Sequence, residues 1–462
     1  MDIEGFYLEL VRRYDVSGPR YTSYPTARQF TTAIDEAAYR SAVTRSNEDF
    51  IPSALSLYLH LPFCSSPCFY CGCSRLITRR PEVIAAYLGR LHREVALQGR
   101  CFDRDRLVRQ LHFGGGTPTY LTDIQLAELF AALRAAFSFA TNGPVEFAIE
   151  VDPRSVDAAR IARLAALGFN RVSYGFQDFD PAVQQAVNRI QNPEHCLGLI
   201  AAARKAAFRS VSVDLIYGLP CQTEAGFTRT LRAVAAARPD RVSVYGYAHM
   251  PSQFRAQRLI RNEDLPDANL RLRLLTLAVR ELTTAGYLYI GMDHFALPDD
   301  DLVRARDAGT LQRNFQGYST LAGLDLVGIG LTAIGHVGDL YAQNAKALND
   351  YDAAIDAGRL AVQRGYRLSA DDRARADIIG RLMCYDEMRF ADIERAHDLE
   401  FTRYFAPELE RLAPLAADGL LRVGEDGIAV LPRGCFLRRA LAMVFDAYRP
   451  RETAAKSYSR VI

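Results

Sequence analysis

The chain has 462 residues, 49% of them hydrophobic and 24% charged, which is enough apolar material for more than one domain-sized core. Its 56 lysines and arginines nearly balance its 54 aspartates and glutamates, and the formal net charge of +2 argues against nucleic acid or an anionic membrane as the main partner. No apolar run could span a bilayer, and the opening segment MDIEGFYLELVRRYDV mixes both charge signs, so we expect no membrane helix, no secretory or transit peptide, and a cytoplasmic location.

Four cysteines follow the first predicted strand. The apolar run Ser56–Leu61 leads into Cys64, Cys68, Cys71 and Cys73. Three thiolates at C-x3-C-x2-C spacing can hold three irons of a [4Fe–4S] cluster and leave the fourth iron open to a substrate, because such clusters otherwise take four cysteines. A structural zinc site would need a second ligand pair, which is missing, and nine cysteines are too few and odd in number for a disulfide framework. The other five cysteines are expected to be ordinary buried thiols.

Amphipathic helices then alternate with β-branched strands. Helices are predicted at 82–98, 124–137, 155–167, 194–207 and 223–237, and strands at 108–113, 145–149, 171–176, 210–213 and 242–245. With the strand before the cysteines, this alternation predicts parallel βα units in an α/β fold. Polar residues stand where successive strands end, as at Glu150, Gln177 and Asp214, which favours a closed or nearly closed barrel over a doubly wound sheet. A strand-like run at 287–291 is expected to extend the sheet.

The composition changes beyond about residue 365. Helices predicted at 371–384, 389–397 and 400–412 precede two short strands around a Glu-Asp-Gly turn within 419–430, which predicts a smaller, winged-helix-like domain. It has no dense stripe of lysine and arginine, so a lid or structural cap is favoured over DNA binding. The predicted organisation is an N-terminal arm and lead-in (1–50), a barrel (51–300), an extension and connecting segment (301–364) and a C-terminal helical domain (365–462).

Other motifs lie close to the predicted strand ends. Glycines in 114–116 would let backbone groups approach a ligand closely, although this is no Walker loop, because its Lys-Ser/Thr is missing. Glu150 could accept hydrogen bonds from a ribose, whereas Asp152 is expected to cap the following helix. His336, in a glycine-rich stretch, is expected to be a core histidine rather than an acid.

Nine segments in order carry a resemblance to known enzymes. They are Pro19–Thr26, the cysteine motif at 64–73, His112–Thr119, Ile149–Pro153, Gly175–Asp178, Asp214–Pro220, Gly291–Ala296, Arg313–Tyr318 and Ser459–Ile462. The cysteine motif resembles that of the radical S-adenosylmethionine (SAM) enzymes, and the chain resembles the oxygen-independent coproporphyrinogen III oxidases over essentially its whole length. The resemblance implies a (β/α)6 partial barrel with a [4Fe–4S] cluster whose open iron binds SAM.

The activity implied by the resemblance is the oxidative decarboxylation of two propionates of coproporphyrinogen III to vinyl groups. It gives protoporphyrinogen IX for haem biosynthesis without O2, through hydrogen abstraction by a 5′-deoxyadenosyl radical. Two alternatives stay open: a haem chaperone of radical SAM descent that binds haem without turnover, and, more distantly, a zinc-stabilised winged-helix binding protein. The chaperones typically lack the fourth cysteine and the Pro19–Pro25 segment, and both are present here.

The resemblance also implies roles for single residues. Cys64, Cys68 and Cys71 match the cluster ligands. Contacts to the cluster-bound SAM are implied for Tyr58, Gly115, Glu150 and Ile334, and contacts to a second SAM for Tyr70, Gly116, Thr117, Gln177, Arg189, Asp214 and Ala248. Tyr70 stands where a phenylalanine is expected. Cys73 should lie near the cluster without binding it, because a fourth thiolate would block the open iron, and Cys73 and Tyr58 are the candidate catalytic residues.

Substrate and partner expectations follow from the same resemblance. Coproporphyrinogen III carries four propionates, and arginine pairs bidentately with carboxylates, so Arg20 and Arg313 with Gln316 are candidates for binding it. The polar arm around Arg20 to Pro25 is expected to close over the active site. A reducing donor such as flavodoxin or ferredoxin is the expected partner, and the chain is expected to be a monomer.

Overall fold

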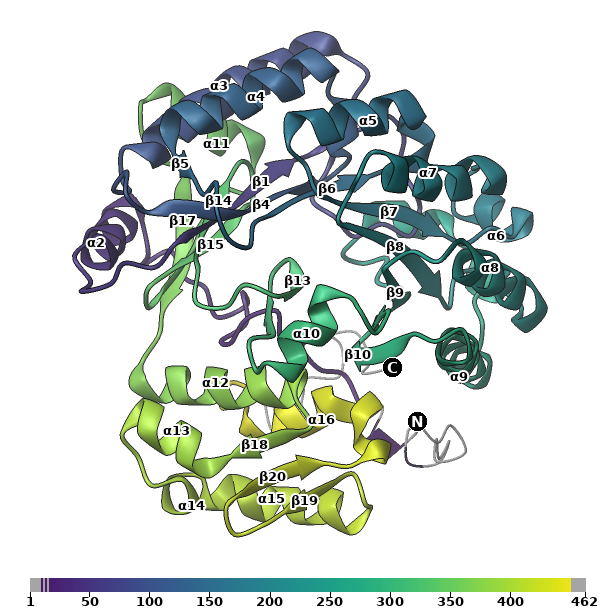
Figure 1. Ribbon diagram of the computed structural model, residues 1–462, viewed down its shortest axis with the longest axis vertical. Helices are drawn as coiled ribbons and strands as arrows, with labels where there is room; N and C mark the ends of the chain where they lie inside the picture. The colour runs from purple at the N-terminus through teal and green to yellow at the C-terminus, as the bar shows by residue number, and fades with distance from the viewer. Residues whose placement is uncertain (1–9, 11–12, 15, 450–462) are drawn as a thin grey trace.

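The computed structural model describes residues 10, 13–14 and 16–449. In this part of the chain, a large curved sheet carries helices on its outer face, and a smaller domain lies across from its inner face (Figure 1). None of the helices described is long and apolar enough to cross a membrane. Most of the opening segment and all of Ser459–Ile462 lie outside the described residues.

The described chain has six parallel strands at the centre of the sheet, as the sequence pattern predicts. In spatial order they are β1 (Leu55–Leu61), β4 (Leu107–Gly115), β6 (Glu146–Val151), β7 (Arg171–Gln177), β8 (Ser210–Tyr217) and β9 (Arg241–Gly246). Helices α3 (Pro81–Gly99), α4 (Asp123–Ala136), α5 (Ala158–Leu167), α7 (Pro193–Lys205) and α8 (Glu224–Ala237) cover the outer face (Figure 1). Local residues set their ends: Thr122 and Gln125 form the predicted capping box of α4, and Gly168 ends α5 with a φ of 112°.

Successive side chains of these strands face opposite sides of the sheet. On β7, the buried Val172, Tyr174 and Phe176 join the core beneath the helices, while Arg171 and Ser173 face the interior of the barrel. The same alternation holds for the neighbouring strands, whose interior positions are Gln110, His112, Glu146, Ala148, Glu150, Ser210, Ser212, Asp214, Arg241, Ser243 and Tyr245. Barrels of this kind usually fill their interior with branched apolar side chains. Here the interior is polar and encloses cavities.

Further strands extend the sheet at both edges. Next to β1 lies the parallel β14 (Asp325–Ile329), followed by the antiparallel β15 (Ile334–Val337), β16 (Leu340–Asn344) and β17 (Val362–Arg367), none of which the sequence pattern predicts as strands. At the other edge, the predicted run at 287–291 forms β10 (Leu288–Gly291), but it reaches β9 only through the intervening antiparallel β11 (His294–Ala296). The strand order is an open path from β10 to β17, so the barrel is partial.

Further elements complete the barrel half. They are α2 (Glu36–Asn47), β2 (Phe63–Cys64), β3 (Leu76–Ile77), β5 (Ser138–Phe139), α6 (Pro181–Ala186), α9 (Ala268–Thr284), α10 (Asp301–Asp307), β12 (Gln312–Asn314), β13 (Gly317–Ser319) and α11 (Leu348–Asp356). Strands β2 and β3 pair in parallel and close the cysteine loop at its base, with Cys64 opposite Ile77.

The C-terminal part has its own apolar core, which includes Ile378, Phe390, Phe401 and Leu412. Its elements are α12 (Ala370–Cys384), β18 (Glu387–Arg389), α13 (Phe390–His397), α14 (Phe401–Tyr404), α15 (Ala406–Ala417), β19 (Leu421–Val423), β20 (Gly427–Val430) and α16 (Arg438–Ala442). The prediction of one helix over 400–412 is wrong: the helix breaks at Phe405, and α15 restarts with Pro407 in its first turn, where proline is tolerated. The predicted two-stranded wing has a third strand, β18.

The N-terminal arm runs between the two halves of the molecule. Tyr21 donates a hydrogen bond to Asp446 (2.8 Å), and the Ala447 backbone N–H donates to the Tyr24 hydroxyl (3.0 Å). On the barrel side, Arg20 forms an ion pair with Asp293. The arm therefore contacts the C-terminal domain and the barrel at once.

Candidate functional site

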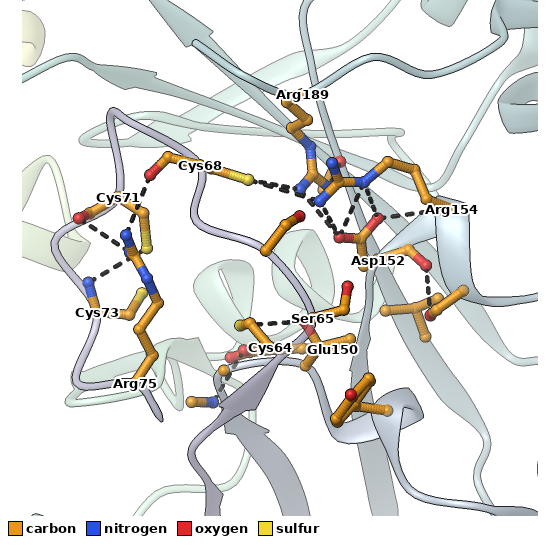
Figure 2. Close-up of a pocket in the computed structure, with 18 of the residues that line it drawn as sticks. Cys64, Ser65, Cys68, Cys71, Cys73, Arg75, Glu150, Asp152, Arg154 and Arg189 are labelled. Carbon is orange, nitrogen blue, oxygen red and sulfur yellow. Dashed lines mark hydrogen bonds and ion pairs between the residues drawn. The ribbon is translucent and has the colours of Figure 1, made fainter. Parts of the chain in front are cut away.

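A cavity of about 300 Å³ lies at the carboxyl ends of the parallel strands. Most of the residues singled out from the sequence line it, namely Cys64, Cys68, Tyr70, Cys71, Cys73, Gly115, Gly116, Thr117, Glu150, Gln177, Arg189 and Asp214. They come from the cysteine loop, from the carboxyl-terminal halves of β4, β6, β7 and β8 or just after them and, for Arg189, from the segment after α6. Figure 2 shows the cysteine loop facing the strand ends across the cavity. Parallel strands end at one edge of a sheet, which explains why residues so distant in sequence converge.

The cysteine loop is held from within by Arg75. Its guanidinium donates hydrogen bonds to the backbone carbonyls of Cys71 (3.0 Å) and Cys68 (3.1 Å). All nine cysteines are free thiols. Outside the loop, Cys196, Cys384 and Cys435 are buried as expected, whereas Cys101 and Cys221 are partly exposed, which corrects that part of the prediction.

Cationic groups surround the loop sulfurs. The Cys68 Sγ accepts hydrogen bonds from Arg189 Nη1 (3.4 Å) and Arg154 Nη2 (3.6 Å), as Figure 2 shows. A hydrogen bond from the Cys73 side chain lowers the pKa of Cys71 to about 6, against the effect of burial, and Arg75 lowers it further. The thiolate is the form of cysteine that binds metal, so a cationic setting suits a cluster held by thiolates.

The pKa values of Cys73 and Cys64 are shifted upward. Donation to Cys71 and burial raise the pKa of Cys73 well above its ordinary value, which keeps Cys73 protonated beside the Cys71 thiolate. Burial raises the pKa of Cys64, although a contact with the Thr117 hydroxyl (3.5 Å) opposes this. Among the described residues, no three histidine, cysteine, aspartate or glutamate side chains are arranged to hold a single metal ion. In a cluster each thiolate binds a different iron, so its ligands need not converge on one point.

The glycine segment after β4 forms another wall. A Cβ at Gly116 would lie 2.6 Å from the carbonyl carbon of Pro62, and Gly115 has a φ of 112° with no room for a side chain beside His60. The Gly115 backbone N–H donates to Glu150 (3.2 Å), and His112 Nε2 lies 3.0 Å from the same carboxylate. Burial alone would raise the pKa of Glu150, but these hydrogen bonds leave it lowered. Glu150 therefore faces the cavity as an anionic acceptor.

An ion-pair network lines the cavity beside Cys68. Asp152 caps the short helical turn Pro153–Ser155 after β6 by accepting from the Arg154 backbone N–H (3.0 Å). The next helix, α5, is capped by Asp157 instead, which corrects the prediction that Asp152 caps it. Asp152 also pairs with the Arg154 side chain (2.6 Å) and with Arg189 (3.1 Å), which the sequence did not indicate. Burial raises the pKa of Asp214 to about 6, and Gln177 holds a left-handed φ of 65°, a strained conformation typical of functional sites.

Tyr58, Ala248 and Ile334 are not among the residues that line this cavity. Tyr58 pairs with Gly328 across β1 and β14, and the backbone of Ile334 lies over that glycine, so the two predicted residues are neighbours. The Ala248 carbonyl accepts from Gln257, which also donates to the Tyr70 carbonyl. Ala248 is thus linked through Gln257 to Tyr70, which lines the cavity.

Sequence reasoning missed several residues of the site. Arg75, Arg154 and Ser173 line the cavity, and His112 binds Glu150. His112 and Ser173 could have been found, because they are polar residues at alternate positions of otherwise apolar strands.

Burial lowers the pKa of His336 to about 4, and its ring stacks on Tyr341 at 4.1 Å, so it is a neutral ring in the β15–β16 pair.

Comparison with known proteins supports the sequence resemblance. Residues 58–234 match the Radical SAM superfamily, and residues 368–437 match the HemN C-terminal domain. The chain is 48% identical over 457 residues to the oxygen-independent coproporphyrinogen III oxidase of Pseudomonas aeruginosa and 46% identical over 455 residues to that of Escherichia coli, with 98% of both chains covered in each case. A solved structure described as coproporphyrinogen III oxidase (HemN) from Escherichia coli, a radical SAM enzyme, matches with a TM-score of 0.91 and 44% identity over 96% of this chain and 99% of that one.

Proposed function

The chain belongs to the oxygen-independent coproporphyrinogen III oxidases of the radical SAM superfamily, and we propose that it converts two propionates of coproporphyrinogen III to vinyl groups. Each conversion removes one hydrogen atom from the propionate, releases CO2 and passes one electron to an acceptor, so the protein is an oxidoreductase that needs no O2. The observation that carries the proposal is the cavity where the cysteine loop meets the glycine segment and the strand-end carboxylates.

Cys64, Cys68 and Cys71 would hold the [4Fe–4S] cluster, and the surrounding arginines offset the negative charge of their thiolates. When bound, the cluster and SAM supply the one-electron cleavage of SAM and the hydrogen abstraction that follows. Cys73 would stay outside the ligand set and contribute to the cavity lining.

Two groups of residues would bind SAM. Gly115, Glu150, Tyr58 and Ile334 would contact the SAM at the cluster, with Glu150 accepting from hydroxyl or ammonium groups. Tyr70, Gly116, Thr117, Gln177, Arg189, Asp214 and Ala248 would contact a second SAM. The proposal is supported by the cavity lining, which includes Gly115 and Glu150 of the first group and every member of the second group except Ala248.

The arm around Arg20 would close the active site, because it contacts both the barrel and the C-terminal domain. We further propose that a small reducing protein such as flavodoxin or ferredoxin donates the electron and that the enzyme acts in the cytoplasm as a monomer. The oxidase interpretation is favoured over a haem chaperone, since the relatives compared above carry the oxidase name.

The test is an anaerobic assay with coproporphyrinogen III, SAM and a strong reductant, after the cluster has been reconstituted with iron and sulfide. We expect 5′-deoxyadenosine, methionine, CO2 and protoporphyrinogen IX. A protein that binds haem stoichiometrically but forms no protoporphyrinogen would instead be a haem chaperone.

A further inference from the structure

A second cavity, of about 160 Å³, lies inside the barrel below the first. The two cavities share Glu150, Ser173 and Asp214 in their linings, so they adjoin. Its far end is formed by the first residues of two strands, Arg171 of β7 and Arg241 of β9. Between them runs β8, with Ser210 opposite Arg171 and Ser212 opposite Arg241 in the strand register.

Arg171 is only partly satisfied by its protein partners. Its side chain is 7% exposed, and its Nη2 pairs with Glu146 (2.8 Å) and Asp301 (2.7 Å). Its Nε and Nη1 atoms are buried with no hydrogen-bond partner. Arg241 pairs through Nε with Asp300 (2.9 Å), while its Nη2 has no partner either, and the same holds for Nε2 of Gln316 in the lining. Buried N–H groups left in this way cost stability unless something accepts from them.

The acceptors at this end are already engaged. Glu146 accepts from Arg171, from Gln110 (2.9 Å) and from Thr320. Asp300 accepts from Arg241 and from the Leu302 backbone N–H (2.7 Å). Neither carboxylate accepts from the unpaired N–H groups of Arg171 and Arg241.

Charge separates the two ends of this cavity. The two arginines lie close enough to affect each other: burial and the nearby Arg241 guanidinium lower the pKa of Arg171, although Glu146, Asp300 and Asp301 oppose the shift. At the other end, Glu150 and Asp214 are acidic groups that would repel an anion. A small group with several acceptor oxygens, a negative charge and no donors fits the arginine end, and a carboxylate meets all three requirements.

We propose that Arg171 and Arg241, assisted by Gln316, bind a propionate carboxylate of the porphyrinogen substrate inside the barrel. The proposal rests on the proposed function, because that substrate supplies four propionates, of which two do not react. The cavity adjoins the site of the chemistry through Glu150, Ser173 and Asp214, so an anchored propionate would hold the macrocycle next to it. The site would thus recognise the substrate by a propionate side chain that does not react in that round.

The test measures binding to the reconstituted enzyme under anaerobic conditions, with coproporphyrin III and its tetramethyl ester as fluorescent probes. Arg171→Lys and Arg241→Lys each keep a positive charge for the neighbouring carboxylates but remove the guanidinium N–H groups that have no partner. We expect coproporphyrin III to bind about tenfold more weakly to each variant, since each loses a hydrogen bond to a charged group. Affinity for the ester, affinity for SAM and iron content should stay as in the wild type.

Two further variants serve as controls. Arg209→Lys changes a half-exposed arginine that also pairs with Asp301 (3.0 Å), and it should leave coproporphyrin binding unchanged. Ser212→Asp adds a carboxylate to the cavity lining without removing an ion pair, and it should weaken coproporphyrin but not ester binding even if a lysine variant fails to fold.

Normal coproporphyrin binding by folded Arg171→Lys, Arg241→Lys and Ser212→Asp would overturn the site and leave the cavity to water. The proposal would also be wrong if the variants lost affinity equally for coproporphyrin III and for its tetramethyl ester. The same holds if they bound SAM more weakly while binding coproporphyrin III normally. The proposed function fails separately, when wild-type enzyme binds coproporphyrin III yet forms no protoporphyrinogen IX.

Discussion

Glu94 on α3 is a fully buried carboxylate that the proposed chemistry does not use. It accepts hydrogen bonds from the Tyr351 hydroxyl (2.6 Å), the Asn344 amide (2.6 Å) and the Gly330 backbone N–H (2.8 Å). Gly330 begins the turn that leads into Ile334, one of the predicted SAM contacts. Glu94 thus ties helix α3 to the sheet extension next to the site.

Burial raises the pKa of Glu94 from 4.5 to about 7, although its hydrogen bonds oppose the shift. Between these two values the folded protein binds a proton that the unfolded chain has already lost, so the free energy of unfolding falls as pH rises and levels off above about pH 7. For this shift the decrease between pH 5.5 and 8 is about 2 kcal/mol. Glu94→Gln removes the titrating group, and the unfolding free energy of wild type minus that of the variant should decrease by this amount over the same range.

The assay is anaerobic urea unfolding followed by circular dichroism, because the chain contains no tryptophan for fluorescence. Subtracting the unfolding free energy of the variant from that of the wild type removes the contributions of the other titrating groups, which the two proteins share. Glu128→Gln, an exposed substitution on the neighbouring helix α4, is the matched control and should show no such trend. If the difference in unfolding free energy between wild type and Glu94→Gln stays constant from pH 5.5 to 8, the raised pKa of Glu94 is refuted.

Three other predictions concern the reaction itself. Serine at Cys64, Cys68 or Cys71 should abolish both the brown cluster and SAM cleavage, as measured by iron content and 5′-deoxyadenosine; full iron and normal cleavage would remove that residue from the ligand set. Deleting residues 1–25 should spare the cluster but stop porphyrinogen turnover, and unchanged turnover would reduce the arm to a packing element. Cys73→Ser should keep about the wild-type iron and sulfide content yet form little or no protoporphyrinogen. Loss of its cluster would overturn the non-ligand assignment, and full activity would leave Cys73 as packing.

Local features could be predicted from the sequence because their causes are local. The capping box at Thr122 and the left-handed Gly168 depend on residues within one turn of a helix. The parallel order of the central strands follows from alternating helices and strands. The convergence of Glu150, Gln177 and Asp214 follows in turn, since parallel strands end at one edge. The domain limits at residues 50, 300 and 364 stay a prediction.

The tertiary structure decided what depends on pairing between distant segments. Strand β14 joins β1 across more than 250 residues, and β11 separates β10 from β9, which no local pattern specifies. Likewise, Arg189 contacts Asp152 and Cys68, which lie on two loops distant from it in sequence. Arg171 and Arg241 come close inside the barrel only because their strands flank β8. Residue type and spacing thus determined the chemistry available to this chain. Which charges are paired and which buried donors stay open depends on long-range packing, because only the assembled sheet sets the distances between them.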